Sequence, residues 1–181
     1  QEVVTVLFSD IKGFTYFSAT ASPIEVVETL NDYFWEMTHV VMEYNGYVDK
    51  FIGDGLMAIF RGDTKGHHPP RAVSAGLKML DRLRKLNRER KRLGLWEIQI
   101  RIGIHTGDIV HDSDGVFGDG VNVASRIEGL SAPGGVMISG KVFDEIKNHP
   151  SLSAVSIGNV RLKNVEYRLQ VFAISAEGIS V

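Results

Sequence analysis

The apolar positions of this chain form short β-like runs, separated by stretches with helical spacing. The first run, Val3–Phe8, is followed closely by Asp10. Two more runs lie within Val48–Phe60 and are broken by Gly-Asp-Gly at 53–55, the pattern of a β-hairpin with Asp54 at its tip. If these runs are neighbours in one sheet, the two carboxylates meet at one edge of it.

Two long stretches repeat apolar residues every three or four positions, which predicts amphipathic helices. The first begins at Ser22-Pro23-Ile24-Glu25, a capping box with proline in the first turn, and ends at Asn45-Gly46. Gly46 is expected to end it in the left-handed conformation. The second covers about 71–93. Residues expected to face the core are Val27, Leu30, Phe34, Met37 and Val41 in the first helix, and Val73, Leu77, Leu80 and Leu83 in the second.

The remaining pattern is a series of shorter elements. Gly13 allows a tight turn into a short helix through Phe17. Ile98–Ile104 alternates as a strand, after which 105–108 is expected to turn the chain. Later come a loop entering a helix at 118–127, a strand at 136–139, a short helix at 142–147, and β pattern at 160–163 and 169–174. This alternation predicts an α/β sandwich in which helices pack on a mixed sheet.

Composition narrows the class of protein. A length of 181 residues suits one domain, and a net charge of −2 provides no field for recruiting nucleic acid. The absence of cysteine excludes disulfides and thiolate sites and fits a reducing, cytoplasmic setting. No apolar run approaches the ~20 residues of a membrane span. Because the chain begins at Gln1, it is expected to be a piece of a longer protein, with any membrane attachment outside it.

The two converging carboxylates suggest metal chemistry. Asp10 and Asp54 would repel each other unless a cation lay between them, and a hard ion such as Mg²⁺ or Mn²⁺ would also bring substrate phosphates. Phe14 and Thr15 begin a short helix, whose free N–H groups would face those phosphates. The alternative is an ordinary Gly-Asp-Gly turn, with Asp10 acting as a cap.

Two other clusters are expected to be structural. His67 and His68 lie among glycines and prolines, which favours an exposed loop at 62–70 over a metal site. Basic residues gather toward the end of the second long helix, where a solvated, cation-favouring C-terminus explains them. They are Arg82, Arg84, Lys85, Arg88, Arg90, Lys91 and Arg92.

Four segments, in order, resemble the signature segments of class III nucleotide cyclase catalytic domains, the adenylate and guanylate cyclases. They are VLFSDIKGFT (6–15), DKFIGDG (49–55), RIGIHTG (101–107) and GDGVNVASR (118–126). The resemblance extends from Val3 to about Ile174. Any one segment is a weak signal, but four in register are highly specific.

The resemblance implies a ferredoxin-like βαββαβ core with a mainly antiparallel sheet, in a single catalytic domain covering 1–181. It also implies a head-to-tail homodimer with two active sites lying across the interface. The implied reaction converts a nucleoside triphosphate to its 3′,5′-cyclic monophosphate and pyrophosphate, with two Mg²⁺ or Mn²⁺ ions per site. Such a reaction needs no protein nucleophile, so His105 is expected to be structural.

Functional residues carry over by position. Asp10 and Asp54 resemble the ligands of both metal ions, and the Ile11 carbonyl resembles an additional ligand of one ion. Asn122 resembles the residue that orients the ribose, and Arg126 the one that stabilises charge on the α-phosphate.

The remaining phosphates and the base are matched by other positions. Arg101 resembles a triphosphate-binding arginine, and Lys163 is the candidate for the lysine on the β- and γ-phosphates. Lys50 matches the position that helps choose the purine, and as a donor it suits N1 of adenine rather than N1–H of guanine.

One position departs from the adenylate cyclase pattern. Gly115 stands where these enzymes often carry an Asp or Thr that accepts from the adenine amino group. Asp114 could serve only if the loop shifts by one residue; a backbone carbonyl is another possible acceptor. ATP is the expected substrate, with a guanylate or mixed-specificity cyclase and a nucleotide-binding regulatory module as alternatives. A diguanylate cyclase is disfavoured, because the turn at 53–55 continues into Leu56 without that family's hairpin motif.

Overall fold

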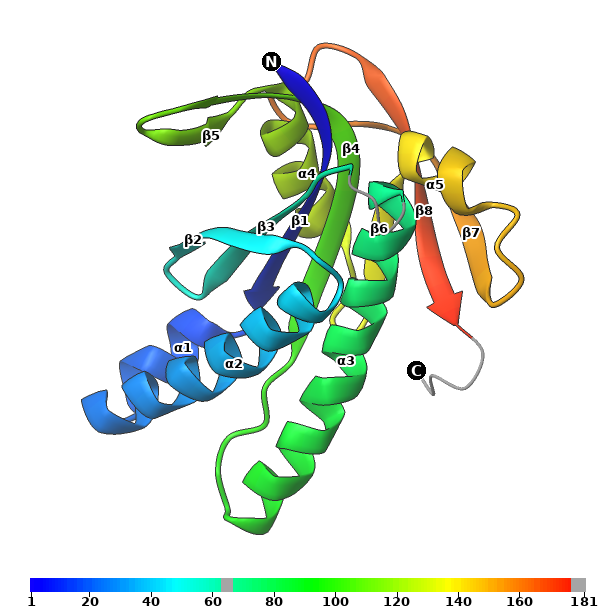
Figure 1. The fold of residues 1–181 in the computed structure, drawn as a ribbon. Helices are drawn as coiled ribbons and strands as arrows, with labels where there is room; N and C mark the ends of the chain where they lie inside the picture. Colours follow the sequence, from blue (N-terminus) through cyan, green and yellow to red (C-terminus); the bar gives the residue numbers. More distant parts are fainter. Residues whose placement is uncertain (63–66, 177–181) are drawn as a thin grey trace.

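The computed structural model describes residues 1–62 and 67–176. Strand β1 (Glu2–Ile11) lies inside the sheet, between β3 (Gly55–Phe60) and β4 (Ile100–Asp112), and is antiparallel to both. The full strand order is β2-β3-β1-β4-β6-β8-β7, with β5 paired to β4 (Figure 1). The other bounds are α1 Phe14–Thr20, α2 Pro23–Glu43, β2 Tyr47–Ile52, α3 His68–Arg92, β5 Gly115–Phe117, α4 Asp119–Leu130, β6 Val136–Ser139, α5 Gly140–Ile146, β7 Leu152–Arg161 and β8 Arg168–Ala176.

The first half of the chain forms the expected ferredoxin-like core. Helices α1 and α2 connect β1 to the β2–β3 hairpin, and α3 connects that hairpin to β4. The four strands lie in the antiparallel order β2-β3-β1-β4. Strand β6 is parallel to β4, so the whole sheet is mixed and mainly antiparallel. The α/β class and βαββαβ arrangement predicted above are therefore confirmed.

Helices cover both faces of this sheet (Figure 1). Leu7, Leu56 and Ile102 face a large apolar cluster built with α2, α3 and α5. On the other face, α4 packs Ala124 against β1 and β3 and Val123 against β6 and β8. Alternate residues of the central strands thus enter two apolar layers, which fixes their register. None of the helices in the described part is long and apolar enough to cross a bilayer.

Helix α2 begins as predicted but ends differently. The Ser22 hydroxyl accepts the Glu25 N–H at 3.2 Å, which is the expected cap. At the other end Asn45, not Gly46, takes the left-handed conformation, with φ of +59°. Gly46 is required for space instead, because a Cβ there would lie 2.5 Å from the Phe60 ring. Val27 is exposed, so its predicted place in the core was wrong.

Helix α3 begins at His68, three residues earlier than expected, and His68 is buried rather than exposed in a loop. Its Nδ1 lies 2.6 Å from the Thr5 hydroxyl, which in turn contacts Thr106. His67 instead pairs with Glu145 at 2.8 Å. Both histidines thus have structural partners, and the part of the predicted loop at 63–66 lies outside the described residues.

The basic end of α3 is not uniformly solvated. The Arg90 side chain is only 3% exposed, because its guanidinium binds the Trp96 carbonyl, the Thr29 hydroxyl and Asp32. The expectation of a solvated face was wrong at this residue. Arg90 ties the loop after α3 to α2.

The predicted turn at 105–108 does not exist. Strand β4 continues to Asp112 and pairs with β1 from Ile100 to Ile109. His105 and Thr106 in this stretch are buried and bonded to other strands: His105 Nδ1 lies 2.8 Å from the Ser139 hydroxyl, and Thr106 contacts Thr5, whereas Asp108 is exposed. Of β7, only Val160 and Arg161 fall within the predicted β pattern at 160–163. Most residues of this strand are exposed, so its alternation of apolar and polar residues is weak.

Replacing Arg90 with methionine tests the α2–α3 tie. We expect Arg90→Met to lower the free energy of unfolding by about 2 kcal/mol, because the Trp96 carbonyl and Thr29 hydroxyl lose a charged donor. Urea denaturation measures this. The matched control is Arg88→Met on the exposed side of the same helix, expected to change stability by less than about 0.5 kcal/mol. Equal effects of both substitutions would contradict a structural role for Arg90.

The buried imidazole of His105 predicts acid sensitivity. Burial lowers the pKa of His105 to about 4, so the unfolded chain takes up this proton first as the pH falls. Stability is therefore retained above pH ~6.5 and lost between ~6.5 and ~4, by at most about 3 kcal/mol from this group. We expect His105→Asn to flatten the pH dependence of urea stability in this window. An unchanged slope would show that His105 does not carry this effect.

Candidate active site

The end of β1 and the tip of the β2–β3 hairpin meet. The Ile11 N–H donates to Asp54 Oδ2 at 2.9 Å, and Gly53 provides the positive φ of +60° that the hairpin turn requires. Asp10 and Asp54 both line a hollow of about 190 Å³. The structure thus brings together the two carboxylates that the sequence pointed to. The full lining is Phe8, Ser9, Asp10, Ile52, Asp54, Gly55, Ser125 and Glu128.

Arg101 holds Asp10 from the neighbouring strand. It lies opposite Asp10 in the β1–β4 register, and its Nε and Nη2 donate to the two carboxylate oxygens at 3.1 and 3.0 Å. A forked, two-bond contact of this kind fixes both groups. Arg101 was predicted to bind the triphosphate. In the structure it binds Asp10, one of the two predicted metal ligands, and its side chain is one third exposed.

Glu128 is a residue of this hollow that the sequence analysis missed. It is buried where α4 crosses β4, at Gly103, where a Cβ would come within 2.2 Å of the Glu128 backbone nitrogen. The pKa of Glu128 is raised well above its ordinary value. Burial is the main cause, and the hydrogen bonding and negative charge of Asp10 add to it. A signal did exist, since Glu128 continues the apolar face of Val121 and Ala124 at helical spacing.

The two predicted transition-state residues lie on α4. Asn122 and Arg126 are both exposed, one helical turn apart. Lys163 is exposed in the loop between β7 and β8.

That loop is attached to α4 in two ways. The Tyr167 hydroxyl donates to Asp119 Oδ2 at 2.5 Å, and Leu162 and Val165 pack with the helix residues Val123 and Ile127. The structure therefore gives Asn122, Arg126 and Lys163 one common support.

The two predicted base-selecting positions are also neighbours. A Cβ on Gly115 would lie 3.2 Å from Lys50 Nζ, and the Lys50 ammonium sits 5.5 Å from the centre of the Phe117 ring. Gly115 and Phe117 of β5 thus border the Lys50 side chain, which remains 35% exposed.

Phe14 and Thr15 do not line the hollow beside Asp10. Phe14 is half-buried against the core and Phe17, whereas Thr15 is exposed. Their predicted contact with phosphates stays a prediction. His105, which was expected to be structural, is buried on a neighbouring part of β4 and bonded to Ser139.

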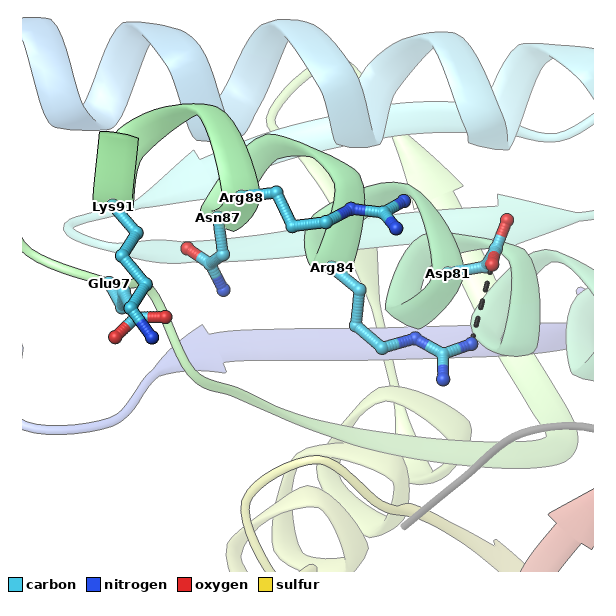
Figure 2. A pocket seen from close by; sticks show the side chains of 6 residues that line it. All are labelled: Asp81, Arg84, Asn87, Arg88, Lys91 and Glu97. Carbon is cyan, nitrogen blue, oxygen red and sulfur yellow. Dashed lines mark hydrogen bonds and ion pairs between the residues drawn. The ribbon is translucent and has the colours of Figure 1, made fainter. Parts of the chain in front are cut away.

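A separate surface hollow, lined by none of these residues, lies along the second half of α3 (Figure 2). Its Arg84 pairs with Asp81, and its Asn87 both donates to and accepts from the backbone of Ile98. Asn87 thus supports the chain after α3, whereas the Arg84–Asp81 pair lies within the helix itself.

In the part of the chain that the structure describes, three carboxylates line the hollow: Asp10 and Asp54, which are partly exposed, and Glu128, which is buried. Within residues 1–62 and 67–176 there is no group of three or more His, Asp or Glu side chains that could hold a metal ion. An ion bound here would therefore need further oxygen ligands from the backbone or from a substrate.

Comparison with known proteins identifies the family. The sequence model of the family described as the adenylate and guanylate cyclase catalytic domain matches residues 1–176. An adenylate cyclase of Anabaena cylindrica is 36% identical over 96% of this chain, which spans 37% of that protein's length. The structure of the adenylyl cyclase CyaB from P. aeruginosa has a TM-score of 0.86 at 29% identity, covering 98% of this chain and 97% of that one. The guanylyl cyclase Cya2 has a TM-score of 0.85 at 31% identity, with coverage of 98% and 93%.

Similar solved domains include nucleotide-bound and dimeric forms. The whole-length match agrees with the four segments noted in the sequence and with the sheet order of the structure. The chain therefore belongs to the adenylate and guanylate cyclase catalytic domain family, the purine nucleotide cyclases.

Proposed function

We propose that this chain is the catalytic domain of an adenylate cyclase, which converts ATP to 3′,5′-cyclic AMP and pyrophosphate. The observation that carries the proposal is the junction of β1 with the hairpin, where the Ile11–Asp54 bond places two carboxylates in one hollow. The similarity to adenylate cyclases over nearly the whole chain supports ATP as the substrate. Since the chain spans only part of these relatives, we further propose that it belongs to a longer protein.

The residues of the hollow fit divalent ions. Asp10, Asp54 and the Ile11 carbonyl offer the hard oxygen ligands that Mg²⁺ and Mn²⁺ prefer, and the family generally uses divalent metals. Two such ions would lower the pKa of the ribose 3′-hydroxyl and offset charge on the leaving pyrophosphate.

Arg101 has two tasks in this proposal. Its guanidinium binds both oxygens of Asp10 in the structure, so it would compete with a metal ion for that carboxylate. Once released, the same guanidinium can bind the triphosphate, for which its permanent charge and forked donors are suited.

The α4 side of the site supplies the groups for the sugar and phosphates. Asn122 would orient the ribose, Arg126 would stabilise the charge that develops on the α-phosphate, and Lys163 would bind the β- and γ-phosphates. Tyr167 and the packing of the β7–β8 loop on α4 hold these three residues in one arrangement, which favours their binding the same nucleotide.

We propose that each complete site combines two copies of the chain. The Asp10–Asp54 hollow would come from one copy, and the α4 side with Lys50 would come from its twofold partner. The exposure of Asn122, Arg126 and Lys163 leaves them accessible to a nucleotide held by another copy. A dimeric guanylyl cyclase domain among the similar solved structures supports dimerisation in general.

A mixed-specificity cyclase is the second candidate function. Gly115 provides no side-chain acceptor for the adenine amino group, and guanylyl cyclases are among the similar structures. Lys50 still favours adenine, because its ammonium can donate to N1 but would meet the N1–H of guanine.

A turnover assay tests the proposed function. With ATP and Mn²⁺ or Mg²⁺, the protein should release cyclic AMP and pyrophosphate, and chelation with EDTA should abolish this, because Asp10 and Asp54 would face the triphosphate as bare like charges. GTP measured in parallel should be the poorer substrate. Equal rates would establish mixed specificity, and no cyclic product from either nucleotide would leave a regulatory module.

Complementation between inactive variants tests the shared site. Asp54→Ala and Asn122→Ala should each be nearly inactive, but their mixture should recover up to about a quarter of the wild-type rate, since half the dimers regain one of two sites. Mixing Asp54→Ala with Asp10→Ala is the matched control and should recover nothing, because both changes damage the same half. Recovery in the control, or none in the test, would contradict the composite site.

A further inference from the structure

Asp49 is a nearly buried acid that none of the roles above uses. Its side chain is 10% exposed, and Oδ2 is buried with no hydrogen-bond donor reaching it from the described residues. The nearest cation, Lys50 Nζ, is 3.6 Å away, beyond a good hydrogen bond. A buried carboxylate oxygen without a donor is costly, and a ligand that supplied the missing bond would remove that cost.

A β-bulge gives Asp49 its orientation. Val48 pairs with Ala58 and Lys50 pairs with the next residue, Met57, so Asp49 is an extra residue in β2. Neighbouring side chains on a regular strand point to opposite faces, whereas a bulge re-aims one of them. Asp49 and Lys50 consequently lie within ion-pair distance, and their acceptor and donor come together.

The same space is bordered by Gly115. A Cβ built there would lie 3.2 Å from Lys50 Nζ and 3.9 Å from Asp49 Oδ2, so a side chain at 115 would meet both groups. With φ of +120°, this position also disfavours any residue other than glycine. The carboxylate of Asp49, from β2, therefore borders the space beside Gly115 that no side chain of β5 fills.

We propose that Asp49 is a specificity-determining residue that accepts a hydrogen bond from the 6-amino group of adenine, while Lys50 donates to N1. This inference rests on the proposed cyclase function. Guanine presents a carbonyl at position 6 and an N–H at position 1, so it would place like groups against both side chains. Phe117, beside the Lys50 ammonium, limits where that donor can lie.

The test compares ATP with purine riboside triphosphate, which keeps N1 but lacks the 6-amino group. Wild-type kcat/KM should favour ATP by about ten- to a hundred-fold, and Asp49→Ala should remove this preference by lowering the ATP value. Asp49→Asn, which keeps an acceptor oxygen at nearly the same volume, should retain part of it. Thermal unfolding of each variant shows whether the fold is kept.

The other outcomes are distinct. If Asp49 only supported Lys50, both nucleotides would lose activity equally in Asp49→Ala, and the proposal would be overturned. Asp114→Ala is the matched control; Asp114 is exposed beside Gly115, and its loss should leave the preference unchanged. A preference lost in Asp114→Ala and retained in Asp49→Ala would also overturn the proposal. Absence of wild-type turnover with ATP would instead refute the cyclase function itself.

Discussion

The hydrogen bond from the Ile11 amide to Asp54 joins the end of β1 to the tip of the β2–β3 hairpin, and the site depends on this junction. It places two carboxylates, distant in sequence, around one hollow, where their repulsion must be offset. In this structure the forked contact of Arg101 neutralises Asp10, and the buried Glu128 beside it has a raised pKa that favours the uncharged form. The hollow therefore has limited negative charge in this structure.

The second half of the site depends on how closely α4 approaches the sheet. Gly103 makes room for the backbone of Glu128, and Asn122 and Arg126 extend from the exposed side of the same helix. Tyr167 and the β7–β8 loop add Lys163 to this unit. Both groups of residues rest on helices and strands of the sheet, so the proposed pairing of two copies would bring them together without refolding either one.

Much of the fold could be predicted from the sequence, because the periodicity of apolar residues and the helix-capping residues are local signals. Ser22 caps α2, Gly53 opens the hairpin turn, and the strand and helix alternation gave the right class. The errors arose at residues whose conformation and burial depend on partners distant in the sequence. His105 and Thr106 suggested a turn but bond to Ser139 and Thr5 inside the sheet, and Arg90 is buried by partners on α2 and in the following loop. The convergence of Asp10 with Asp54 was predictable, whereas Glu128 and the bulge at Asp49 needed the three-dimensional arrangement.

In the proposed mechanism, Asp10 and Asp54 together hold the metal ions that bind the nucleotide. Calorimetric titration of 3′-deoxy-ATP, which lacks the attacking hydroxyl, measures nucleotide binding with Mn²⁺ and with EDTA in the absence of turnover. Binding should be markedly tighter with Mn²⁺, and Asp10→Asn and Asp54→Asn should each remove that gain. A gain from Mn²⁺ that persists undiminished in both variants would contradict the account.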